Sequence, residues 1–470
     1  MSGFFGIASK KECITELFYG TDYHSHLGTN RAGMSTFDLE EGKVHLNIHN
    51  ISNSYFRTKF MNDLEEMKGK LGIGVISDTE PQPVVVNSHL GRFAVVTVAR
   101  INNKDELTRE CLAQHQQFAE LSMGGTNATE LVALMITQGK TLLEGIQNVF
   151  NKVKGSCSML ILTEEGIYCA RDRYGRTPIV IGKGENGYAM ASENHSFINL
   201  GYDTCYYVGP GEVVRVNADG ITQIKKPEDK MQICSFLWIY YGYPCVEYED
   251  INNEQMRHRL GYAMGKDDDV EADFVSAIPD SGIGMAQGYA EGKGIPYKSG
   301  FLKYTPTWSR SFMPVNQESR QLVAKMKLIP CKKVLEGKDV VFCDDSIVRG
   351  TQLRDQVKML YDCGCKHVHV RISCPPLVYG CQWLNFSASK TDKELITLRC
   401  IEELEGGKLQ NIEAYRDCTT QQYANMVEMI RKKVGVDTLK FNSLQTVVDA
   451  IGLPKDRVCL HCFDGSSYGE

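Results

Sequence analysis

The chain has 470 residues, with 52 Lys and Arg against 58 Asp and Glu, which gives a formal net charge of −6. A single hydrophobic core rarely extends beyond about 300 residues, so this length predicts two domains. With 42% hydrophobic and 23% charged residues, the composition is that of a globular protein and excludes a disordered or fibrous chain. The acidic balance argues against nucleic acid as a partner.

The sequence shows no membrane or export signal. No apolar run approaches the roughly 18–20 residues that span a membrane. The first residues, MSGFFGIASKKEC, lack the basic-then-apolar pattern of a secretion signal. We therefore expect a cytoplasmic protein without membrane association. In that reducing compartment the 17 cysteines are expected to be free thiols, with a metal or cluster site among them, rather than a disulfide framework.

Short apolar strands and amphipathic helices fill the chain up to residue 225. The expected strands are Gly3–Ala8, Leu71–Val75, Phe93–Val98, Ser158–Thr163 and Glu212–Val216. Apolar residues at helical spacing predict helices over Lys104–Leu121, Ala128–Gln138 and Leu142–Val153. This arrangement favours a layered α+β domain over residues 1–228.

A polar segment, IKKPEDKMQIC (Ile224–Cys234), is the expected linker. Beyond it, strands and helices alternate regularly. The expected strands are Asp273–Pro279, Asp339–Phe342 and His367–Cys374, and the expected helices between them are Gly284–Glu291 and Gln352–Tyr361. This alternation predicts an α/β domain with a parallel sheet and right-handed crossovers over residues 229–385. A mainly helical C-terminal region is expected over residues 386–470.

The strongest chemical signal is VVFCDDSIVRGT (Val340–Thr351), in which an apolar strand ends in Asp344 and Asp345 and a short loop leads into a helix. In an open α/β sheet, ligands bind at the carboxyl ends of the strands. The backbone N–H groups of the loop and of the helix N-terminus form a natural phosphate cradle. The two carboxylates can accept hydrogen bonds from sugar hydroxyls or hold Mg²⁺ with a diphosphate. Together these features indicate a sugar phosphate.

This segment resembles the phosphoribosyl-diphosphate (PRPP) motif of type I phosphoribosyltransferases. The alternative is a strand end with solvated acids followed by an ordinary helix cap. A second loop, AIPDSG (Ala277–Gly282), also lies between a strand and a helix, although its sequence fits a common turn equally well. The resemblance implies that Ser281, Asp344 and Asp345 hold Mg²⁺. The PRPP-binding residues that it implies are Asp280, Ser281, Gly282, Lys303, Asp344, Asp345, Ser346, Val348, Arg349, Gly350 and Thr351.

Over nearly its whole length the chain resembles the glutamine PRPP amidotransferase family. The resemblance rests on SGFFGIA, HLGTNRAGM, AIPDSGIGMAQGYAEGKGIPY, LEGKDVVFCDDSIVRGTQLR and HVHVRISCPP. It implies an N-terminal glutaminase with the αββα layers of N-terminal-nucleophile hydrolases, joined to a type I phosphoribosyltransferase domain. In the family, ammonia released at the first site attacks C1 of PRPP at the second, in purine synthesis. Members are commonly dimers or tetramers, so a homo-oligomer is expected.

Some members of the family carry a [4Fe–4S] cluster on four cysteines. Cys459 and Cys462 form a Cys-x-x-Cys pair, which alone fits zinc or redox chemistry equally well. The cluster ligands that the resemblance implies are Cys234, Cys381, Cys459 and Cys462. Buried thiols without a cluster are the alternative, and Cys374 and Cys245 compete for individual ligand places. The cluster would be structural, because the transfer reaction needs no electron.

The glutaminase half departs from the family pattern where its chemistry is done. Ser2 stands in place of the cysteine nucleophile, and a hydroxyl is the weaker nucleophile of the two. The other changed positions, which in the family bind the glutamine carboxylate and amine or form the oxyanion hole, are Leu27, Ser77, Val98, Ala99 and Ala128. Loss of a single oxyanion donor typically costs about 10²–10³ in rate. We therefore expect no glutamine hydrolysis. The pocket is expected either to have drifted without use, or to bind another ligand or contact a partner.

The loop KYTPTWSRSF (Lys303–Phe312) is also altered. In the family this loop closes over PRPP and helps to form the ammonia channel. Lys303, Arg310 and Phe312 match the family, whereas Thr305 replaces an arginine and Pro306 and Trp308 are new. The amine is therefore expected to be free ammonia or another small amine. The altered loop keeps a second hypothesis open, in which the protein is a non-catalytic sensor of PRPP or nucleotides, or a regulatory partner of an active amidotransferase.

Two histidines in DYHSHLG, His24 and His26, have a spacing that suggests a metal site. The sequence offers no third ligand nearby. The favoured interpretation is that they are core or helix-cap histidines.

Overall fold

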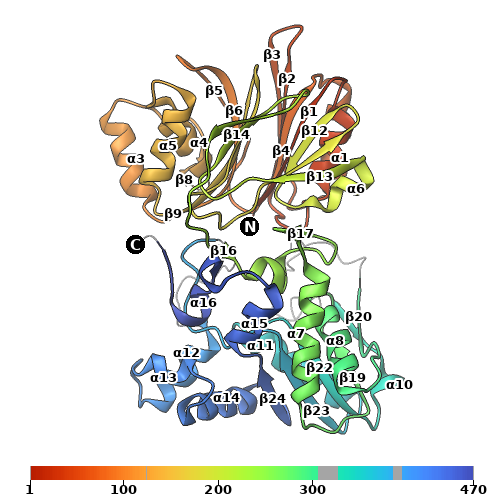
Figure 1. The fold of residues 1–470 in the computed structure, drawn as a ribbon. Coiled ribbons are helices and arrows are strands. Elements are labelled where there is room, and N and C mark those ends of the chain that lie inside the picture. Colours follow the sequence, from red (N-terminus) through yellow and green to blue (C-terminus); the bar gives the residue numbers. More distant parts are fainter. Residues whose placement is uncertain (1, 123, 305–326, 385–393, 469–470) are drawn as a thin grey trace.

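The computed structural model describes residues 2–122, 124–304, 327–384 and 394–468. The chain forms two layered parts, and the N-terminal end of the first strand lies close to the junction between them (Figure 1). Within the described ranges, no helix combines the length and the hydropathy that a membrane crossing requires.

Two antiparallel sheets form the centre of the N-terminal part. The first has the order β13-β11-β12-β1-β4-β2-β3, with bounds Tyr202–Tyr207, Val180–Gly184, Gly187–Ala191, Ser2–Ser9, Leu71–Ser77, Arg31–Asp38 and Lys43–Asn50. The second has the order β15-β14-β10-β9-β6-β5, with bounds Ile221–Lys225, Val213–Val216, Gly166–Ala170, Gly155–Thr163, Gly91–Ile101 and Val84–Ser88. Each strand expected from the sequence in this part is present.

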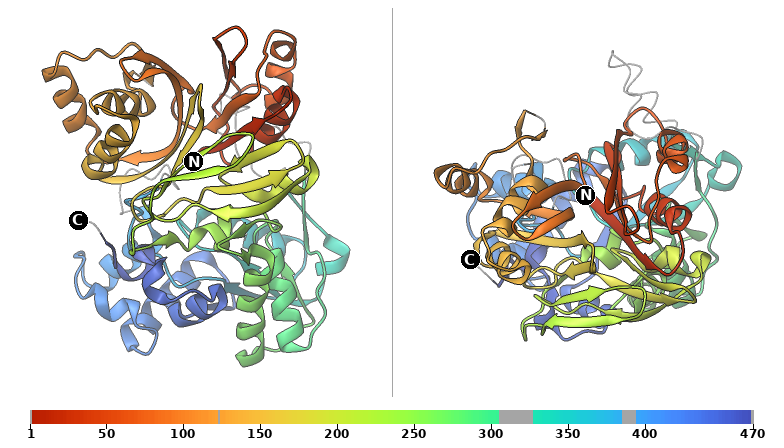
Figure 2. Two further views of the ribbon diagram at one scale, coloured as in Figure 1. Left: turned by 45° about the horizontal axis from the view of Figure 1, so that its top comes forward. Right: turned by 90° about the horizontal axis from the view of Figure 1, so that it is seen from above.

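Helices cover the outer face of each sheet. The first sheet is covered by α1 (Ile14–Asp22), α2 (Phe56–Phe60) and α6 (Phe197–Leu200), and the second by α3 (Lys104–Ala113), α4 (Ala128–Thr137) and α5 (Leu142–Lys152). Both views of Figure 2 show α3, α4 and α5 (orange) on the opposite side of this part from α1 (red). The αββα layers are therefore those that the resemblance implies.

Strand β1 shows why strands of this part have continuous apolar sequences. Successive side chains of a strand point to opposite faces. Phe4 packs between the two sheets with Leu160, whereas Phe5 packs on the other face with Leu17 and Phe18. Because both faces are buried, both sets of alternating positions are apolar.

The helix expected over Lys104–Leu121 is too long by eight residues. Helix α3 ends at Ala113, and His115 adopts a left-handed backbone conformation with φ 62°. Four polar residues, Gln114–Gln117, interrupt the apolar spacing that Leu107 and Cys111 establish, so no buried face continues the helix. Leu121–Ser122 is instead strand β7, which pairs with β8 (Gly125–Thr126).

The C-terminal part is built on a parallel sheet with the order β19-β22-β23-β24, as the alternation of elements predicts. The strands are Phe274–Ala277, Asp339–Asp344, His367–Ile372 and Thr438–Phe441. Helices α7 (Asn253–Asp267) and α8 (Ile283–Lys293) cover one face, and α11 (Thr351–Asp362) and α14 (Gln421–Val434) cover the other.

The described residues of the C-terminal region, 394–468, are mainly helical. They form α12 (Ile396–Leu404), α13 (Ile412–Arg416), α14, α15 (Leu444–Ile451) and α16 (His461–Asp464), and they also supply β24 to the parallel sheet. Strand β24 is only four residues long between helical segments, which is why helical periodicity hides it. The boundaries at residues 228 and 385 stay predictions.

Shorter elements complete the C-terminal part. They are β16 (Ile233–Cys234), β17 (Glu247–Tyr248), β18 (Ile251–Asn252), β20 (Phe301–Lys303), β21 (Leu328–Pro330), α10 (Lys332–Leu335) and β25 (Val458–Cys459). Strand β15 runs to Lys225, so the stretch between the two parts is shorter than the expected linker. Parallel pairing of β16 with β25 fastens the end of this stretch to the C-terminal region.

Candidate functional site

Two loops meet at the carboxyl ends of β19 and β22. The strands pair in parallel, with Ala277 opposite Cys343, so both chains leave the sheet at the same edge. Ser281, in the loop after β19, donates a hydrogen bond from Oγ to Asp345 Oδ2 at 2.6 Å. The two segments with the PRPP-site resemblance are therefore in direct contact.

The paired carboxylates are held in a strongly polar but desolvated environment. Asp345 is 7% exposed, and Ser346 donates a hydrogen bond to its Oδ1 at 2.6 Å. The Asp345 backbone N–H donates to Asp344 Oδ1 at 2.9 Å. Burial raises the pKa of both carboxyls, and the charge of Asp345 raises the pKa of Asp344 further. A bound cation would relieve this concentration of negative charge.

Neighbouring residues fix the backbone of the loop between β22 and α11. Gly350 adopts φ 75° directly before the first residue of α11, Thr351. A Cβ at this position would collide with Ile396 Cδ1, so glycine fits both the conformation and the space. The Val348 and Arg349 carbonyls accept hydrogen bonds from the Ile396 N–H at 2.8 Å and from Arg399 Nη2 at 2.6 Å. The loop's carbonyls are thus occupied by the C-terminal region, and α11 begins with the free N–H groups that bind anions.

Lys303 and Asp280 form an ion pair beside this site. Gly282 lies so close to β22 that a Cβ would collide with the Cys343 carbonyl oxygen. The residues Thr305 to Phe312 of the altered loop lie outside the described residues.

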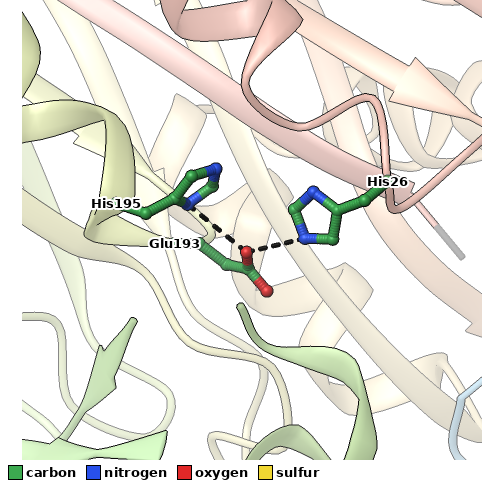
Figure 3. A group of neighbouring side chains, drawn as sticks. All are labelled: His26, Glu193 and His195. Atoms are coloured by element: carbon green, nitrogen blue, oxygen red, sulfur yellow. Dashed lines mark ion pairs between the residues drawn. The ribbon is translucent and has the colours of Figure 1, made fainter. Parts of the chain in front are cut away.

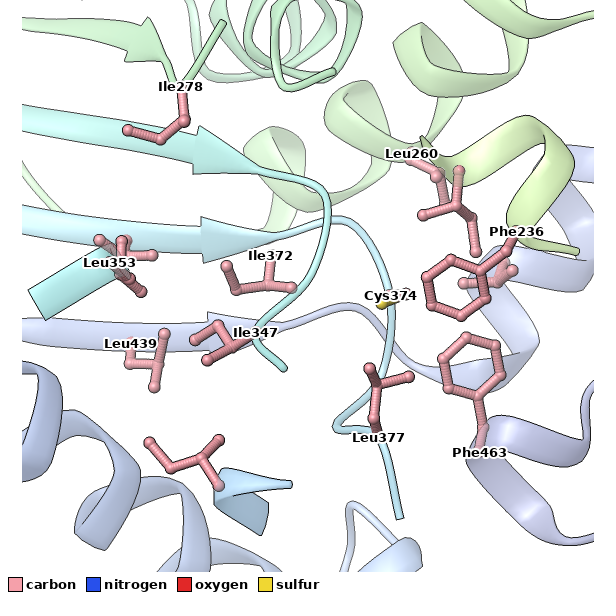
Figure 4. Close-up of a cluster of buried hydrophobic side chains, with 14 of the residues drawn as sticks. Phe236, Leu260, Ile278, Ile347, Leu353, Ile372, Cys374, Leu377, Leu439 and Phe463 are labelled. Carbon is pink, nitrogen blue, oxygen red and sulfur yellow. The ribbon is translucent and has the colours of Figure 1, made fainter. Parts of the chain in front are cut away.

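An apolar cluster lies beneath the loop and continues toward the C-terminal cysteines (Figure 4). Ile347, which is 4% exposed, anchors the loop in this cluster. At its other end Phe236 and Phe463 stack with ring centroids 5.7 Å apart. Phe236 lies two residues after Cys234, and Phe463 directly succeeds Cys462, so the phosphate cradle and the cysteine region share one core.

The four cysteines with a resemblance to cluster ligands converge. Cys234 and Cys459 are opposite each other on β16 and β25. A hydrogen bond with Cys462 lowers the pKa of the Cys381 thiol to about 7. The same hydrogen bond raises the pKa of the Cys462 thiol, and so do burial and the charges of the other three cysteines. Burial, Cys459 and Cys381 raise the pKa of Cys234. Each of the four therefore lies within electrostatic range of the others.

The two competing cysteines lie elsewhere. Cys374 donates from Sγ to the Asp345 carbonyl oxygen at 3.3 Å, beneath the carboxylate loop. Cys245 is exposed, and burial and the charge of Glu193 raise its pKa. Cys374 therefore lies beside the carboxylate loop, and Cys245 lies near Glu193.

Buried donors surround the four thiols. Arg176 is 1% exposed, stacks over the Trp383 ring at 3.8 Å, and lowers the pKa of Cys459 against the effect of burial. Its Nε and Nη1, like Trp383 Nε1, have no hydrogen-bond partner among the described residues. The Leu384 N–H donates to Cys381 Sγ at 3.3 Å. Unpaired buried donors are costly, so this group of side chains suits a bound acceptor of negative charge.

The changed glutaminase positions carry no charged side chain. Ser2 donates from Oγ to Ser77 Oγ at 3.1 Å, across the β1–β4 pairing. A Cβ on Gly3 would collide with Leu27 Cδ1, so Leu27 packs directly against the strand that carries Ser2. Val98 is buried at 6% exposure, and Ala128 is the first residue of α4. Two hydroxyls and apolar groups thus occupy these positions.

The two histidines of DYHSHLG, His24 and His26, have different surroundings. His24 is buried, and its Nδ1 lies 2.8 Å from the Gly20 carbonyl oxygen at the end of α1, which fits the favoured interpretation. His26 instead meets Glu193 and His195. These two residues come after β12, far along the chain, so no spacing in the sequence could reveal them.

A family described as "Glutamine amidotransferase domain" matches residues 69–199. The amidophosphoribosyltransferase of Methanocaldococcus jannaschii is 32% identical to this chain, and the match covers 99% of this chain and 97% of that protein. The amidophosphoribosyltransferase of Bacillus subtilis is also 32% identical, and the match covers 98% of this chain and 93% of that protein.

A solved structure described as glutamine PRPP amidotransferase from B. subtilis complexed with ADP and GMP superposes with a TM-score of 0.85 at 31% identity. The match covers 100% of this chain and 97% of that one. A second, described as the allosteric regulatory enzyme of purine biosynthesis, has a TM-score of 0.83 at 29% identity, covering 100% of this chain and 96% of that one.

Replacement of Gly350 should damage the cradle more than replacement of a left-handed glycine elsewhere. Gly350→Ala is expected to lower stability by about 1–2 kcal/mol for the backbone conformation and by about 1–3 kcal/mol for overpacking against Ile396. Gly435→Ala is the matched control, because Gly435 has φ 81° and open space around it. Urea unfolding of both variants measures the difference. Equal losses would show that Ile396 does not restrict the loop.

Proposed function

Because the chain belongs to the amidophosphoribosyltransferase family, we propose that it transfers ammonia or another small amine to C1 of PRPP, with Mg²⁺ and without glutamine hydrolysis. The observation that carries this proposal is the hydrogen bond from Ser281 to Asp345, which joins a diphosphate loop to a ribose-phosphate loop. On the resemblance to the family we also propose a cytoplasmic homodimer or homotetramer.

Each part of PRPP has a counterpart at this edge of the sheet. The 5′-phosphate would bind the N–H groups of Ser346–Thr351, a segment that includes Val348, Arg349 and Gly350. The ribose hydroxyls would donate to Asp344 and Asp345. The diphosphate would lie along Asp280–Gly282, beside the ammonium group of Lys303.

The oxygen donors of Ser281, Asp344 and Asp345 fit Mg²⁺, which prefers hard oxygen ligands. Burial of two adjacent carboxyls leaves negative charge that a divalent cation would compensate. When bound, Mg²⁺ would supply charge neutralisation for the departing diphosphate. The protein's own contribution is to hold C1 and the leaving group in line for attack.

The reaction needs no covalent intermediate on the protein. The nitrogen lone pair forms a bond to C1 while the bond from C1 to the diphosphate oxygen breaks, and the product ammonium then loses a proton to water. Such transfers depend mostly on positioning and on stabilisation of developing charge. The fixed loop carbonyls, the capped Asp345 and the buried Ile347 provide that positioning.

Loss of glutamine hydrolysis is supported by the chemistry of the changed pocket. Ser2 and Ser77 hydrogen-bond to each other, where the family has a thiol nucleophile and an arginine clamp. Val98 has no side-chain donor for an oxyanion, and Leu27 and Ala128 have no charge to bind the substrate's polar groups. The amine must then come from solution.

We further propose that Cys234, Cys381, Cys459 and Cys462 hold a structural [4Fe–4S] cluster. The fit rests on the convergence of the four thiols and on the unpaired donors of Arg176 and Trp383 around them. Such a cluster with four thiolates carries net negative charge, which these donors would balance. It would cross-link β16, β25, α16 and the segment around Cys381.

The decisive experiment mixes the protein with PRPP and Mg²⁺ and adds either ammonium or glutamine. Diphosphate release is expected with ammonium only, and no glutamate should form from glutamine. Asp345→Asn should lower kcat/KM by at least about 10²-fold, because an electrostatic contact to the substrate is lost. Asp355→Asn, at an exposed position on α11, is the control and should retain activity.

Two results would contradict parts of this proposal. Glutamate release would show that the N-terminal pocket still hydrolyses glutamine. Tight PRPP binding without turnover would favour the second candidate, a PRPP or nucleotide sensor, for which the altered loop after Lys303 is the supporting feature.

Binding of Mg²⁺ and PRPP should strengthen as pH rises. Since the pKa values of Asp344 and Asp345 are raised in the free protein, the ligand must displace protons from these carboxyls. The affinity, measured by calorimetry between about pH 5 and pH 8, should increase through this window. The phosphate of PRPP titrates near pH 6 as well, so the informative quantity is the difference between wild type and Asp344→Asn. An identical slope in both would remove the carboxyl pair from the ligand site.

Protein purified without oxygen should contain the iron and acid-labile sulfide of one cluster. Cys381→Ser is expected to lose both, together with the visible absorption. Cys418→Ser, which changes an exposed cysteine, and Cys245→Ser should keep them. Bound zinc in place of iron, or full iron content in Cys381→Ser, would refute the cluster.

A further inference from the structure

Three side chains converge at the junction of the two parts of the molecule (Figure 3). His26 lies after α1, whereas Glu193 and His195 lie after β12. Glu193 Oε2 lies 2.8 Å from His26 Nε2 and 3.4 Å from His195 Nδ1, and the three atoms are all within 4.8 Å of one another. The side chains of Glu193 and His195 are only 2% and 5% exposed. Both rings turn a nitrogen toward the carboxylate in Figure 3.

The hydrogen bonds of the two rings fix their tautomers. His26 Nδ1 lies 3.2 Å, and His195 Nε2 lies 2.8 Å, from the same carbonyl oxygen, that of Tyr23. A carbonyl oxygen only accepts, so each of these ring nitrogens carries a hydrogen. In the neutral rings the nitrogens that face Glu193 are therefore bare electron pairs.

Three electron-pair donors thus point at one another without a hydrogen between them. A proton on His26 Nε2 would satisfy Glu193 Oε2. It would still leave His195 Nδ1, a buried atom, without a partner among the described residues. Buried polar atoms without partners are rare and costly. A cation at the centre would use all three groups at once.

We propose that His26, Glu193 and His195 bind a divalent transition-metal ion, and that zinc fits this donor set best. Zinc takes imidazole nitrogen and carboxylate oxygen at about 2.0–2.2 Å in tetrahedral geometry. Tetrahedral bonds of that length place ligand atoms about 3.3–3.6 Å apart. The separations of 2.8 and 3.4 Å need only a small expansion to accept the ion. Two nitrogen ligands make Mg²⁺ and Ca²⁺ poor occupants.

The surroundings of the three ligands resemble those of natural zinc sites. Tyr248 donates from its hydroxyl to Glu193 Oε1 at 2.6 Å, which leaves Oε2 for the ion. The Tyr23 carbonyl orients both rings, as the outer partners of metal-binding histidines do. Tyr243 covers the group, with its ring edge-on to His26 at 4.4 Å and stacked on His195 at 5.5 Å.

The ion would connect two segments that are far apart in sequence, the one after α1 and the one after β12. Tyr248 of the C-terminal part donates a hydrogen bond to one of the proposed ligands, Glu193. Leu27, which packs against Gly3 next to Ser2, is the residue directly after His26. Metal binding would therefore fix the position of Leu27 beside the changed glutaminase residues.

The test uses the full chain with its cysteine site loaded, so that the thiols do not compete. After treatment with a chelator, the protein should bind one equivalent of Zn²⁺ or Co²⁺. The Co²⁺ spectrum should lack the intense charge-transfer band of thiolate ligation. Glu193→Gln and His195→Ala should weaken Zn²⁺ affinity more than 100-fold. Tyr248→Phe, which removes only an outer hydrogen bond, should weaken it by about 10–100-fold.

His258→Ala is the matched control. His258 Nε2 lies 3.1 Å from Glu291 Oε2 in a partly exposed pair, and this variant should bind Zn²⁺ as the wild type does. Zn²⁺ should raise the unfolding temperature of the wild type and of His258→Ala but not that of Glu193→Gln. Unchanged affinity in both Glu193→Gln and His195→Ala, or a purely thiolate Co²⁺ spectrum, would overturn the proposal.

Discussion

The hydrogen bonds to the Asp345 carboxylate are the contacts on which the site depends. Ser281 and Ser346 each donate to one oxygen of this buried group. Ser281 can reach Asp345 only because β19 and β22 run parallel and release their loops at one edge. A buried carboxylate without such donors would cost several kcal/mol. The sheet register therefore determines whether the two loops of the proposed PRPP site meet.

The N-terminal part shows that a fold and its chemistry have different requirements. The αββα layers need apolar residues on both faces of β1, and Phe4, Phe5 and Ile7 supply them. The nucleophile position at the start of the same strand makes no such contribution to the core. A serine and a cysteine at this position are therefore equally compatible with the layers, so the fold by itself does not determine the chemistry.

Much of the fold can be predicted from local sequence, whereas contacts between distant segments cannot. Continuous apolar runs predict β1 and β22, and the acidic pair after β22 marks the ligand edge. The end of α3 escapes prediction because the left-handed turn at His115 is set by the polar residues around it rather than by apolar spacing. Strand β24 cannot be predicted in this way because four residues show too little periodicity. The role of His195 cannot be predicted because only the folded sheet brings this residue to its partner, His26.

Hydrogen bonds connect the N-terminal part to the surroundings of the Asp344–Asp345 pair. Glu193 accepts a hydrogen bond from Tyr248, which lies in the segment between Trp238 and α7. In that segment Trp238 and Gly242 offer carbonyl oxygens to the Arg257 guanidinium, each at 2.8 Å.

The charge of Arg257 in turn lowers the pKa of Asp345 against the effect of burial. Glu193 of the N-terminal part is therefore connected to the surroundings of Asp345 by contacts that run through Tyr248 and Arg257. Such a structural role would preserve the N-terminal part even in a protein that does no glutamine chemistry.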